Sequence, residues 1–207
     1  MTPSTVNKTC LALAKLDKDF AKAVKTYGQP QPRNRPAGFE TLFNTIVSQQ
    51  LSTDAASAIM GRARQILPEF NAASVLATDD KHLRAAGMSY RKIEYAKSLA
   101  RAIESKTLDI DHLVTMPDNQ VIETITRLKG FGRWSAEIYL MFSLKREDVF
   151  PADDLALRIA IGKLKNLPEK PSAKQARQLV EHWSPYRTVG SLFLWHYYNG
   201  VKRSPSQ

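Results

Sequence analysis

Two short segments of the chain carry residue types that could do chemistry. The first is the run over 128–137, Leu-Lys-Gly-Phe-Gly-Arg-Trp-Ser-Ala-Glu, in which a glycine pair directly precedes a helical pattern. The second is Pro-Ala-Asp-Asp over 151–154, which places a carboxylate at the start of the next helical pattern. Together they suggest a clamp for a DNA backbone beside a catalytic acid.

The glycine-containing run predicts a tight hairpin between two helices. Gly130 and Gly132 can adopt positive φ angles, and neither carries a Cβ that would hold a phosphate away. The N–H groups that begin the second helix lack intrahelical acceptors and, with the helix dipole, form an anion site suited to a phosphodiester. Taken alone, such a glycine pair is also typical of an ordinary helix–turn–helix joint. Apolar residues follow helical spacing before the hairpin and after it, where they predict a well-buried helix: Val121, Ile122, Ile125 and Leu128, then Trp134, Ile138, Leu140, Met141, Phe142 and Leu144.

The elements that must position these segments are helical throughout, because strand alternation is almost absent from the chain. We expect one N-terminal helix from about Leu11 that ends near Gly28, followed by an extended linker with two prolines. Ser52-Thr53 supplies a cap between two further helices. Thr2–Asn7 and Arg203–Gln207 are expected to be loose. The remaining helices are expected at about 39–51, 55–67, 72–77, 79–86, 90–105, 118–128, 155–164, 174–183 and 188–198. The sequence therefore predicts an all-α domain.

Composition narrows the function classes. The 207-residue chain has a net charge of +10, which favours a polyanionic partner, and its length suits one domain or two small lobes that share a cleft. The single cysteine, Cys10, excludes an intramolecular disulfide, a four-cysteine zinc site and a four-cysteine iron–sulfur cluster. The four histidines show no close metal-ligand spacing. No apolar run is long enough to cross a bilayer and no signal peptide is evident, so we expect an intracellular protein without membrane association.

Several motifs occur together in a characteristic order. They are Phe39-Glu40, Ile46 to Ser52, Ala55-Ala56, Gly130 to Ala136, Phe150 to Asp154, Ser184 to Arg187, and Trp195. On these residues the chain resembles the helix–hairpin–helix (HhH-GPD) DNA glycosylases, in the branch of the DNA-3-methyladenine glycosylase II (alkylpurine) type. The resemblance extends from about Phe39 to Trp195.

That resemblance implies a two-lobed helical fold with a cleft between the lobes. Lobe one would span about 38–145, and lobe two about 8–28 plus 155–202, within a single glycosylase domain over 1–207. The helix–hairpin–helix motif would occupy 121–144. About 38 residues precede Phe39, which is typical of the compact members that lack an extra N-terminal domain.

The resemblance implies that Asp154 is the catalytic carboxylate. Read without it, Asp153-Asp154 before a helix is an N-cap with charge favoured by the helix dipole, and both interpretations can hold at once. Glycosidic cleavage passes through an oxocarbenium-like state, in which positive charge develops on the sugar. A fixed carboxylate can stabilise that charge or orient the attacking water.

Trp134 occupies the position at which bifunctional relatives carry a Schiff-base lysine. Lys129 and Lys145 lie off that position, so we expect a monofunctional enzyme without AP lyase activity. Trp134 and Trp195 would line the base pocket, because aromatic faces attract a cationic alkylated base by stacking and cation–π interaction. Plain core packing is the alternative for each tryptophan.

The family resemblance also assigns the DNA contacts. Gln49, Gln50 and Leu51 would form the loop that fills the gap left by the flipped nucleotide, with Gln50 at the wedge position and Leu51 as the other candidate. The amides of Gly130, Gly132 and Ser135 would hold a phosphate. Arg133 would add charge toward the backbone, unless it pairs with Glu137 four residues on. A monovalent cation, Na⁺ or K⁺, would bind carbonyls of Thr126, Leu128 and Phe131; no other cofactor is expected.

The leading hypothesis is therefore base excision repair of alkylated purines, of the 3-methyladenine and 7-methylguanine class, in double-stranded DNA. The expected protein is a monomer of the bacterial cytoplasm or, in a eukaryote, of the nucleus. A non-catalytic protein that binds lesions or abasic sites is the alternative. A glycosylase for neutral or oxidised bases is a third hypothesis, which the absence of the lysine and of a cluster disfavours.

Overall fold

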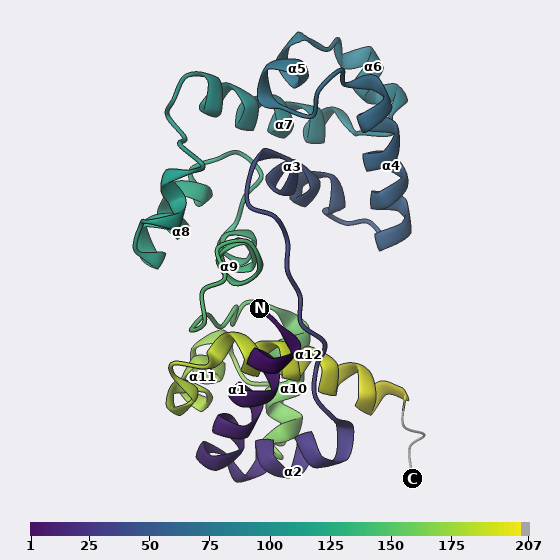
Figure 1. Cartoon of the computed structure of the whole chain (residues 1–207). Helices are drawn as coiled ribbons and strands as arrows, with labels where there is room; N and C mark the ends of the chain where they lie inside the picture. Colours follow the sequence, from purple (N-terminus) through teal and green to yellow (C-terminus); the bar gives the residue numbers. More distant parts are fainter. Residues whose placement is uncertain (204–207) are drawn as a thin grey trace. The chain divides into compact units, whose positions relative to one another are not determined.

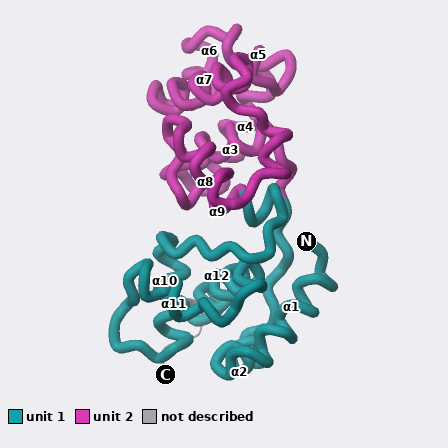
Figure 2. Tube along the Cα trace, turned by 90° about the vertical axis from the view of Figure 1, so that its left-hand side faces the viewer, with its two compact units in different colours: residues 1–34, 140–207 teal, residues 35–139 magenta. Residues whose placement is uncertain are grey.

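The computed structural model describes residues 1–203, with side chains to residue 201, and the chain divides into two compact units (Figures 1 and 2). Unit 1 consists of residues 1–34 and 140–207, and unit 2 consists of residues 35–139. Across residues 1–203 the secondary structure is α-helix, 3-10 helix and turn, without a strand. The predicted all-α fold class is confirmed. No helix in this described range is both long enough and apolar enough to cross a membrane.

Unit 2 is organised around its longest helix, α7. Its helices are α3 (Phe39–Ser48), α4 (Thr53–Ile66), α5 (Ala72–Ala77), α6 (Asp80–Ala85), α7 (Tyr90–Glu104), the 3-10 helix η1 (His112–Val114), α8 (Asp118–Thr126) and the first residues of α9 (Arg133–Phe142). Helices α3, α5 and α6 pack on α7, and α4 packs on α3. The predicted cap between α3 and α4 is confirmed, because the Ser52 hydroxyl accepts a hydrogen bond from the N–H of Ala55 at 3.3 Å.

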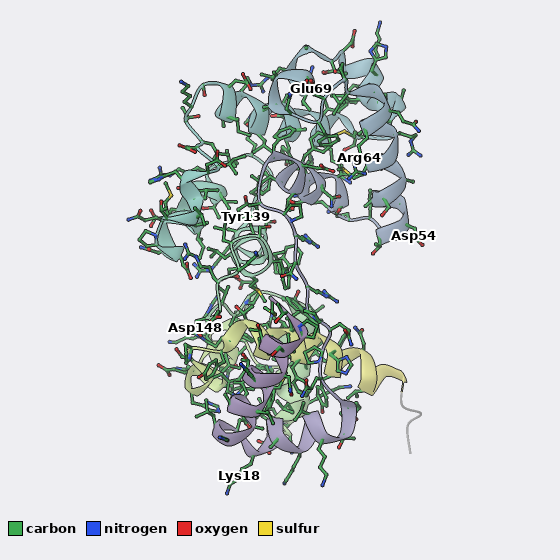
Figure 3. All side chains as sticks on the ribbon, viewed as in Figure 1. Lys18, Asp54, Arg64, Glu69, Tyr139 and Asp148 are labelled. Carbon is green, nitrogen blue, oxygen red and sulfur yellow. The ribbon has the colours of Figure 1, made fainter. Side chains whose placement is uncertain are left out.

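A buried tyrosine ties the start of α3 to α9. The hydroxyl of Tyr139, labelled in Figure 3, accepts a hydrogen bond from the N–H of Gly38 at 3.0 Å. Gly38 is the N-cap of α3 and has a φ of 123°, a conformation that favours glycine. This hydrogen bond therefore fixes the start of α3 against α9 within unit 2.

Unit 1 brings the two ends of the chain together around an aromatic core. It contains α1 (Pro3–Leu16), α2 (Lys18–Tyr27), the end of α9, α10 (Leu155–Leu164), α11 (Ala173–Leu179), the 3-10 helix η2 (Glu181–Trp183) and α12 (Arg187–Arg203). The ring of Phe20 lies 5.5 Å from that of Trp183 and 4.4 Å from that of Phe193, measured between centroids. A Cβ at Gly190 would lie 2.4 Å from the Trp183 ring, so the glycine lets α12 approach it closely.

An ion pair holds the segment between α9 and α10 to the beginning of α12. Arg187, the first residue of α12, donates from Nε and Nη2 to the two carboxylate oxygens of Asp148, each at 2.6 Å. Asp148 is labelled in Figure 3. The hydrogen bonds from Arg187 hold the pKa of the Asp148 carboxyl below its usual value.

The N-terminal region differs from the sequence-based expectation. The predicted single helix is two helices, α1 and α2, separated at Asp17, whose backbone is extended and whose carboxylate caps α2. The expectation that Thr2–Asn7 is loose is wrong. The Thr2 hydroxyl accepts a hydrogen bond from the N–H of Thr5 at 3.1 Å, and this cap starts α1. A capping threonine before a proline at the first helical position is a start signal that the prediction overlooked.

The C-terminal boundaries also differ. The helix predicted over 174–183 is α11 followed by the separate turn η2, and the last helix, predicted over 188–198, extends to Arg203. Residue 203, expected to be loose, is therefore helical, whereas residues 204–207 lie outside the described residues.

Candidate DNA-binding and catalytic site

The hairpin between α8 and α9 is closed by backbone hydrogen bonds. The N–H of Leu128 donates to Ile125 O at 3.1 Å, and the N–H of Phe131 donates to Leu128 O at 3.2 Å. In α9, the N–H of Ala136 donates to Gly132 O at 3.2 Å. The N–H groups before Ala136 belong to the first turn, where an α-helix offers its donors to an external acceptor. This geometry suits an anion, as predicted for the hairpin.

The two glycines have different functions, which corrects the expectation that both exploit a positive φ. Gly130 has a φ of 84°, and a Cβ there would lie 2.2 Å from Cδ2 of the Tyr95 ring. Gly132 lies outside the left-handed region, and a Cβ there would meet no protein atom within 4 Å. Gly130 therefore permits the hairpin to pack on Tyr95, whereas Gly132 leaves open space in front of the first turn of α9.

A hollow of about 580 Å³ lies against the hairpin and is called the hairpin hollow below. Three short segments of unit 2 line it: Gln49 and Gln50, then Ser89, Arg91, Lys92 and Tyr95, then Gly130, Gly132 and Ser135. Its charged lining residues are Arg91 and Lys92, both cationic, so the hollow complements a phosphate electrostatically. The sequence analysis did not place Lys92 or Tyr95 at the hairpin. The available signal was the capping residue Ser89, which is followed by the cations Arg91 and Lys92.

The end of α3 and the turn that follows it are each held by a hydrogen bond to another segment of unit 2. The Gln49 side chain donates from Nε2 to Gly130 O at 2.7 Å, and Lys92 donates from Nζ to Val47 O at 2.6 Å. Burial lowers the pKa of the Lys92 ammonium. Gln50 is exposed and has a φ of 58°, and the next residue, Leu51, is 40% exposed. The turn therefore presents Gln50 and Leu51 to solvent, whereas Gln49 is engaged with the hairpin.

Two residues in the first turn of α9 differ from their simplest sequence interpretation. Arg133 donates from Nε to Glu137 at 2.9 Å, so the i,i+4 ion pair weighed as its alternative forms. Trp134 was placed in the buried face of this helix, but its side chain is 43% exposed. A tryptophan this exposed is not a core residue, so the core-packing alternative does not apply to Trp134. Lys129, the neighbouring lysine, pairs with Glu94 at 2.7 Å.

In unit 1 the predicted catalytic carboxylate is also a helix cap. Asp154 is the N-cap of α10, and its Oδ1 accepts from the N–H of Leu157 at 2.9 Å. The same oxygen accepts from the indole N–H of Trp195 at 3.2 Å. Both sequence-based interpretations, cap and chemically placed carboxylate, are thus compatible at one residue. Asp153 is exposed and pairs with Arg177 at 3.5 Å.

Trp195 is half-buried and lies near a buried aromatic ring and an exposed arginine. The Phe142 ring centroid lies 6.1 Å from it, and the guanidinium carbon of Arg33 lies 5.9 Å from its ring centroid. The indole N–H points at Asp154, so Trp195 orients the carboxylate in addition to offering a ring. Arg33 was not predicted, because its linker position carries no motif.

The proposed cation ligands are backbone carbonyls at the hairpin. Leu128 O accepts one hydrogen bond, from Phe131, and a carbonyl oxygen has two lone pairs, so it retains an acceptor site. The Thr126 hydroxyl bonds back to Ile122 O and Glu123 O, which directs the side chain away from its own carbonyl. These carbonyls fit a monovalent cation chemically, and the assignment stays a prediction.

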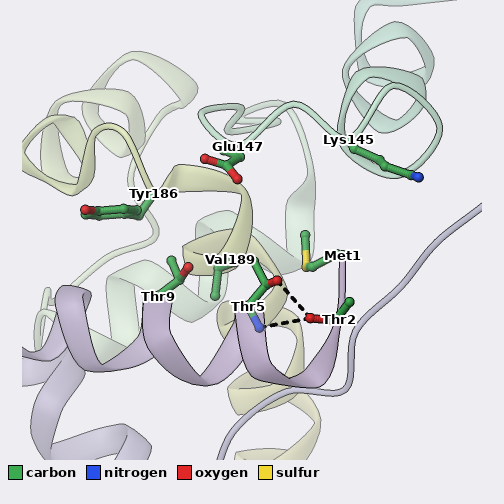
Figure 4. Close-up of a pocket in the computed structure, with 8 residues that line it drawn as sticks. All are labelled: Met1, Thr2, Thr5, Thr9, Lys145, Glu147, Tyr186 and Val189. Carbon is green, nitrogen blue, oxygen red and sulfur yellow. Dashed lines mark hydrogen bonds between the residues drawn. The ribbon is translucent and has the colours of Figure 1, made fainter.

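A second hollow, of about 220 Å³, lies in unit 1 at the N-terminal helix (Figure 4). One side is formed by Met1, Thr2, Thr5 and Thr9 and the other by Lys145, Glu147, Tyr186 and Val189. Of the candidate residues, it includes neither the carboxylate Asp154 nor the two tryptophans. It therefore has no part in the chemistry argued below.

The hairpin, the offered helix amides and the capping carboxylate define a helix–hairpin–helix protein. The family model described as "HhH-GPD superfamily base excision DNA repair protein" matches residues 43–185. The chain belongs to this superfamily.

Named relatives come from yeast and bacteria. The chain is 33% identical over 203 residues to DNA-3-methyladenine glycosylase 1 of Schizosaccharomyces pombe, which covers 93% of this chain and 87% of that protein. A solved structure of a DNA-3-methyladenine glycosidase from Bacillus halodurans has a TM-score of 0.84 at 34% identity, covering 98% of this chain and 93% of that one. A 3-methyladenine DNA glycosylase of S. pombe, solved in complex with abasic DNA, has a TM-score of 0.81 at 31% identity, covering 97% and 99%.

Proposed function

We propose that this protein is a monofunctional DNA glycosylase that hydrolyses the N-glycosidic bond of alkylated purines in duplex DNA and leaves an abasic site. The observation that carries the proposal is the Asp154 carboxylate, which the N–H groups of Leu157 and Trp195 hold at the start of α10. The names of the relatives and of the solved structures support this substrate class.

In the reaction, the bond between the sugar C1′ and the purine nitrogen breaks, and its electron pair leaves with the base. Positive charge develops on the sugar, and Asp154 stabilises it electrostatically or orients the water that attacks C1′. The oxygen of that water forms the new bond, and its proton passes to the carboxylate or to solvent. A cationic alkylated purine becomes neutral as it leaves, so the step proceeds without a protein acid at the base.

The remaining predicted residues have assigned tasks in this scheme. In unit 1, Trp195 contacts the extruded base beside Asp154. In unit 2, Trp134 offers an exposed aromatic face to a base, and the amides of Gly132 and Ser135 hold a phosphate. Gln50 and Leu51, the exposed residues of the turn, fill the gap in the duplex. Trp134 replaces the lysine of lyase-type relatives, so strand scission is not part of the reaction.

The test is release of free base from methylated duplex DNA by wild type and Asp154→Asn, with alkali-free strand scission scored in parallel. Asparagine caps helices as well as aspartate does, so the variant keeps the start of α10. We expect release to fall at least about 100-fold, the usual cost of losing one electrostatic stabiliser, with binding to abasic DNA retained. Asp153→Asn, one residue away, is the matched control and should keep wild-type release.

Retained release in Asp154→Asn would refute the assignment of Asp154. The alternative function is a non-catalytic protein that binds lesions or abasic sites. Abasic DNA is the product of the proposed reaction, so its presence in one structural relative is compatible with both functions. A wild type that releases no base but binds abasic duplex tightly would support that alternative.

A further inference from the structure

We propose that Gln49 is a positioning residue that couples the hairpin to the turn after α3. Through it, phosphate capture by the hairpin would fix the turn that replaces the flipped base. The inference rests on the proposed function and deepens it. It assigns to Gln49 a role within the protein, whereas the sequence had placed this residue among the DNA contacts.

The hairpin side of the coupling is a single peptide unit held at both ends. Its carbonyl, Gly130 O, accepts from Gln49 Nε2 at 2.7 Å, and its N–H, that of Phe131, donates to Leu128 O at 3.2 Å. Because a peptide unit is planar, these two bonds together fix its orientation. The next residue in the chain is Gly132, where a Cβ would meet no protein atom within 4 Å, so a phosphate can approach its backbone. The Gln49 bond therefore constrains the donors that the hairpin offers.

The turn side of the coupling contains a strained residue. Gln50 follows Gln49 directly and has a φ of 58°, which is uncommon outside glycine. Such a conformation persists where neighbouring contacts enforce it. Here the Gln49 side chain holds the turn on one side of Gln50, and the Ser52 cap of α4 holds the other. Loss of the Gln49 bond would let the φ of Gln50 return to a common value. The side chains of Gln50 and Leu51 would then no longer be held in one orientation.

Gln49 is therefore the link between two loops that are 81 residues apart in sequence. Both loops line the hairpin hollow, so one stretch of DNA backbone can contact both. If Gln49 had only a structural role, its substitution would change the stability of the protein alone. A coupling residue changes discrimination between damaged and undamaged DNA, and its effect depends on whether the hairpin can hold a phosphate.

The experiment is a double-mutant cycle between Gln49→Met and Gly132→Ala. Methionine matches the length of glutamine but cannot donate, and Gly132→Ala places a Cβ in the open space beside the hairpin. Affinity is measured for duplexes that contain a tetrahydrofuran abasic analogue beside 2-aminopurine, and for the matched undamaged duplex. The fluorescence of 2-aminopurine reports unstacking beside the gap. Gln65→Met, at an exposed position of α4, is the control for the added methionine.

We expect Gln49→Met to lower affinity for the abasic duplex about fivefold, the usual loss for one hydrogen bond, and to reduce the fluorescence change. Affinity for undamaged duplex should stay at the wild-type value. The two substitutions should be non-additive, so that the double variant loses clearly less than the product of the single losses. Gln49→Glu, which also cannot donate to Gly130 O, should reproduce the loss of discrimination.

Additive losses, equal weakening of both duplexes, or wild-type discrimination in Gln49→Glu would each overturn the coupling. The analogue cannot be cleaved, so the cycle is scored independently of base release. A wild type that binds the abasic duplex without releasing methylated bases would overturn the proposed function and leave the coupling standing. A wild type that does not distinguish the two duplexes would overturn both.

Discussion

At the scale of single residues, Asp154 combines two functions in one oxygen atom. Oδ1 accepts both from the α10 backbone and from the indole of Trp195, which comes from a helix about forty residues later. A carboxylate held by two donors cannot rotate freely, so its charge stays where the helix start places it. The cap that begins the helix is thus also what orients the proposed catalytic group.

This arrangement predicts the effect of Trp195→Phe. Phenylalanine keeps an aromatic ring for stacking but removes the N–H donor to Asp154. We expect the single-turnover rate of base release to fall about tenfold, because a hydrogen bond to a charged group contributes about 1.5 kcal/mol. Binding to abasic duplex should change little. A wild-type rate in this variant would mean that Trp195 acts through its ring alone.

At the scale of elements, the hairpin uses its two glycines for different purposes. Gly130 needs its left-handed conformation and its lack of a side chain, because the Tyr95 ring packs directly against it. Gly132 has no such neighbour within the protein. Its missing side chain matters only when something occupies the space in front of α9. Packing of the hairpin and its anion binding are therefore separable by mutation.

Alanine at each glycine should separate these two effects. Gly130→Ala should lower the free energy of unfolding by about 2 kcal/mol, from the positive φ and the collision with Tyr95. Gly132→Ala should change it by less than about 0.5 kcal/mol. Denaturant titration measures both. In filter-binding or anisotropy measurements, Gly132→Ala should nevertheless lower the affinity of the protein for duplex DNA. Full DNA affinity in a folded Gly132→Ala protein would contradict the phosphate site at the hairpin.

At the scale of the whole molecule, the candidate residues belong to two units. The hairpin, the turn after α3 and Trp134 are in unit 2, whereas Asp154 and Trp195 are in unit 1. Unit 1 is discontinuous, so its stability depends on contacts between the two ends of the chain. Asp17 is central to those contacts, because its buried carboxylate accepts from Lys165 at 2.7 Å and from Trp183 Nε1 at 2.7 Å. His182 Nε2 lies 3.1 Å from the same carboxylate.

These contacts predict a pH-dependent stability. Burial acts to raise the pKa of Asp17, but the hydrogen bonds from Lys165, Trp183 and the N–H of Phe20 outweigh it and lower the pKa to about 2. An unfolded aspartate titrates near 3.9, so this stabilisation is present above that pH and is lost as the pH falls toward 2. It amounts to about 2.6 kcal/mol, at about 1.36 kcal/mol per pKa unit. Urea titrations between pH 5 and pH 2, followed by tryptophan fluorescence, measure it.

Asp17→Asn should remove this pH-dependent component and lower the free energy of unfolding at neutral pH by about 3 kcal/mol, because it breaks a buried ion pair. Asp19→Asn is the matched control. Asp19 also contacts Lys165, at 3.0 Å, but its side chain is 41% exposed. Its loss should cost below about 1 kcal/mol. Equal effects of the two substitutions would contradict the central role of Asp17.

The sequence by itself determined the helical fold class and the family, because helical periodicity and local motifs are properties of neighbouring residues. Start signals within one segment, such as Ser52 before α4, were also predictable. The break at Asp17 was not, since its capping carboxylate is held by Lys165 and Trp183, far away in sequence.

Only the tertiary structure decided how the candidate site residues are used. Trp134 fits the apolar spacing of α9 but is exposed, because periodicity does not say which neighbours cover the first turn. Gln49 and Gln50 are identical in type, yet one bonds Gly130 O and the other faces solvent. Gly130 and Gly132 likewise differ in φ and in whether Tyr95 lies beside them. Side-chain type fixes what a residue can do, and contacts between distant segments fix what it does.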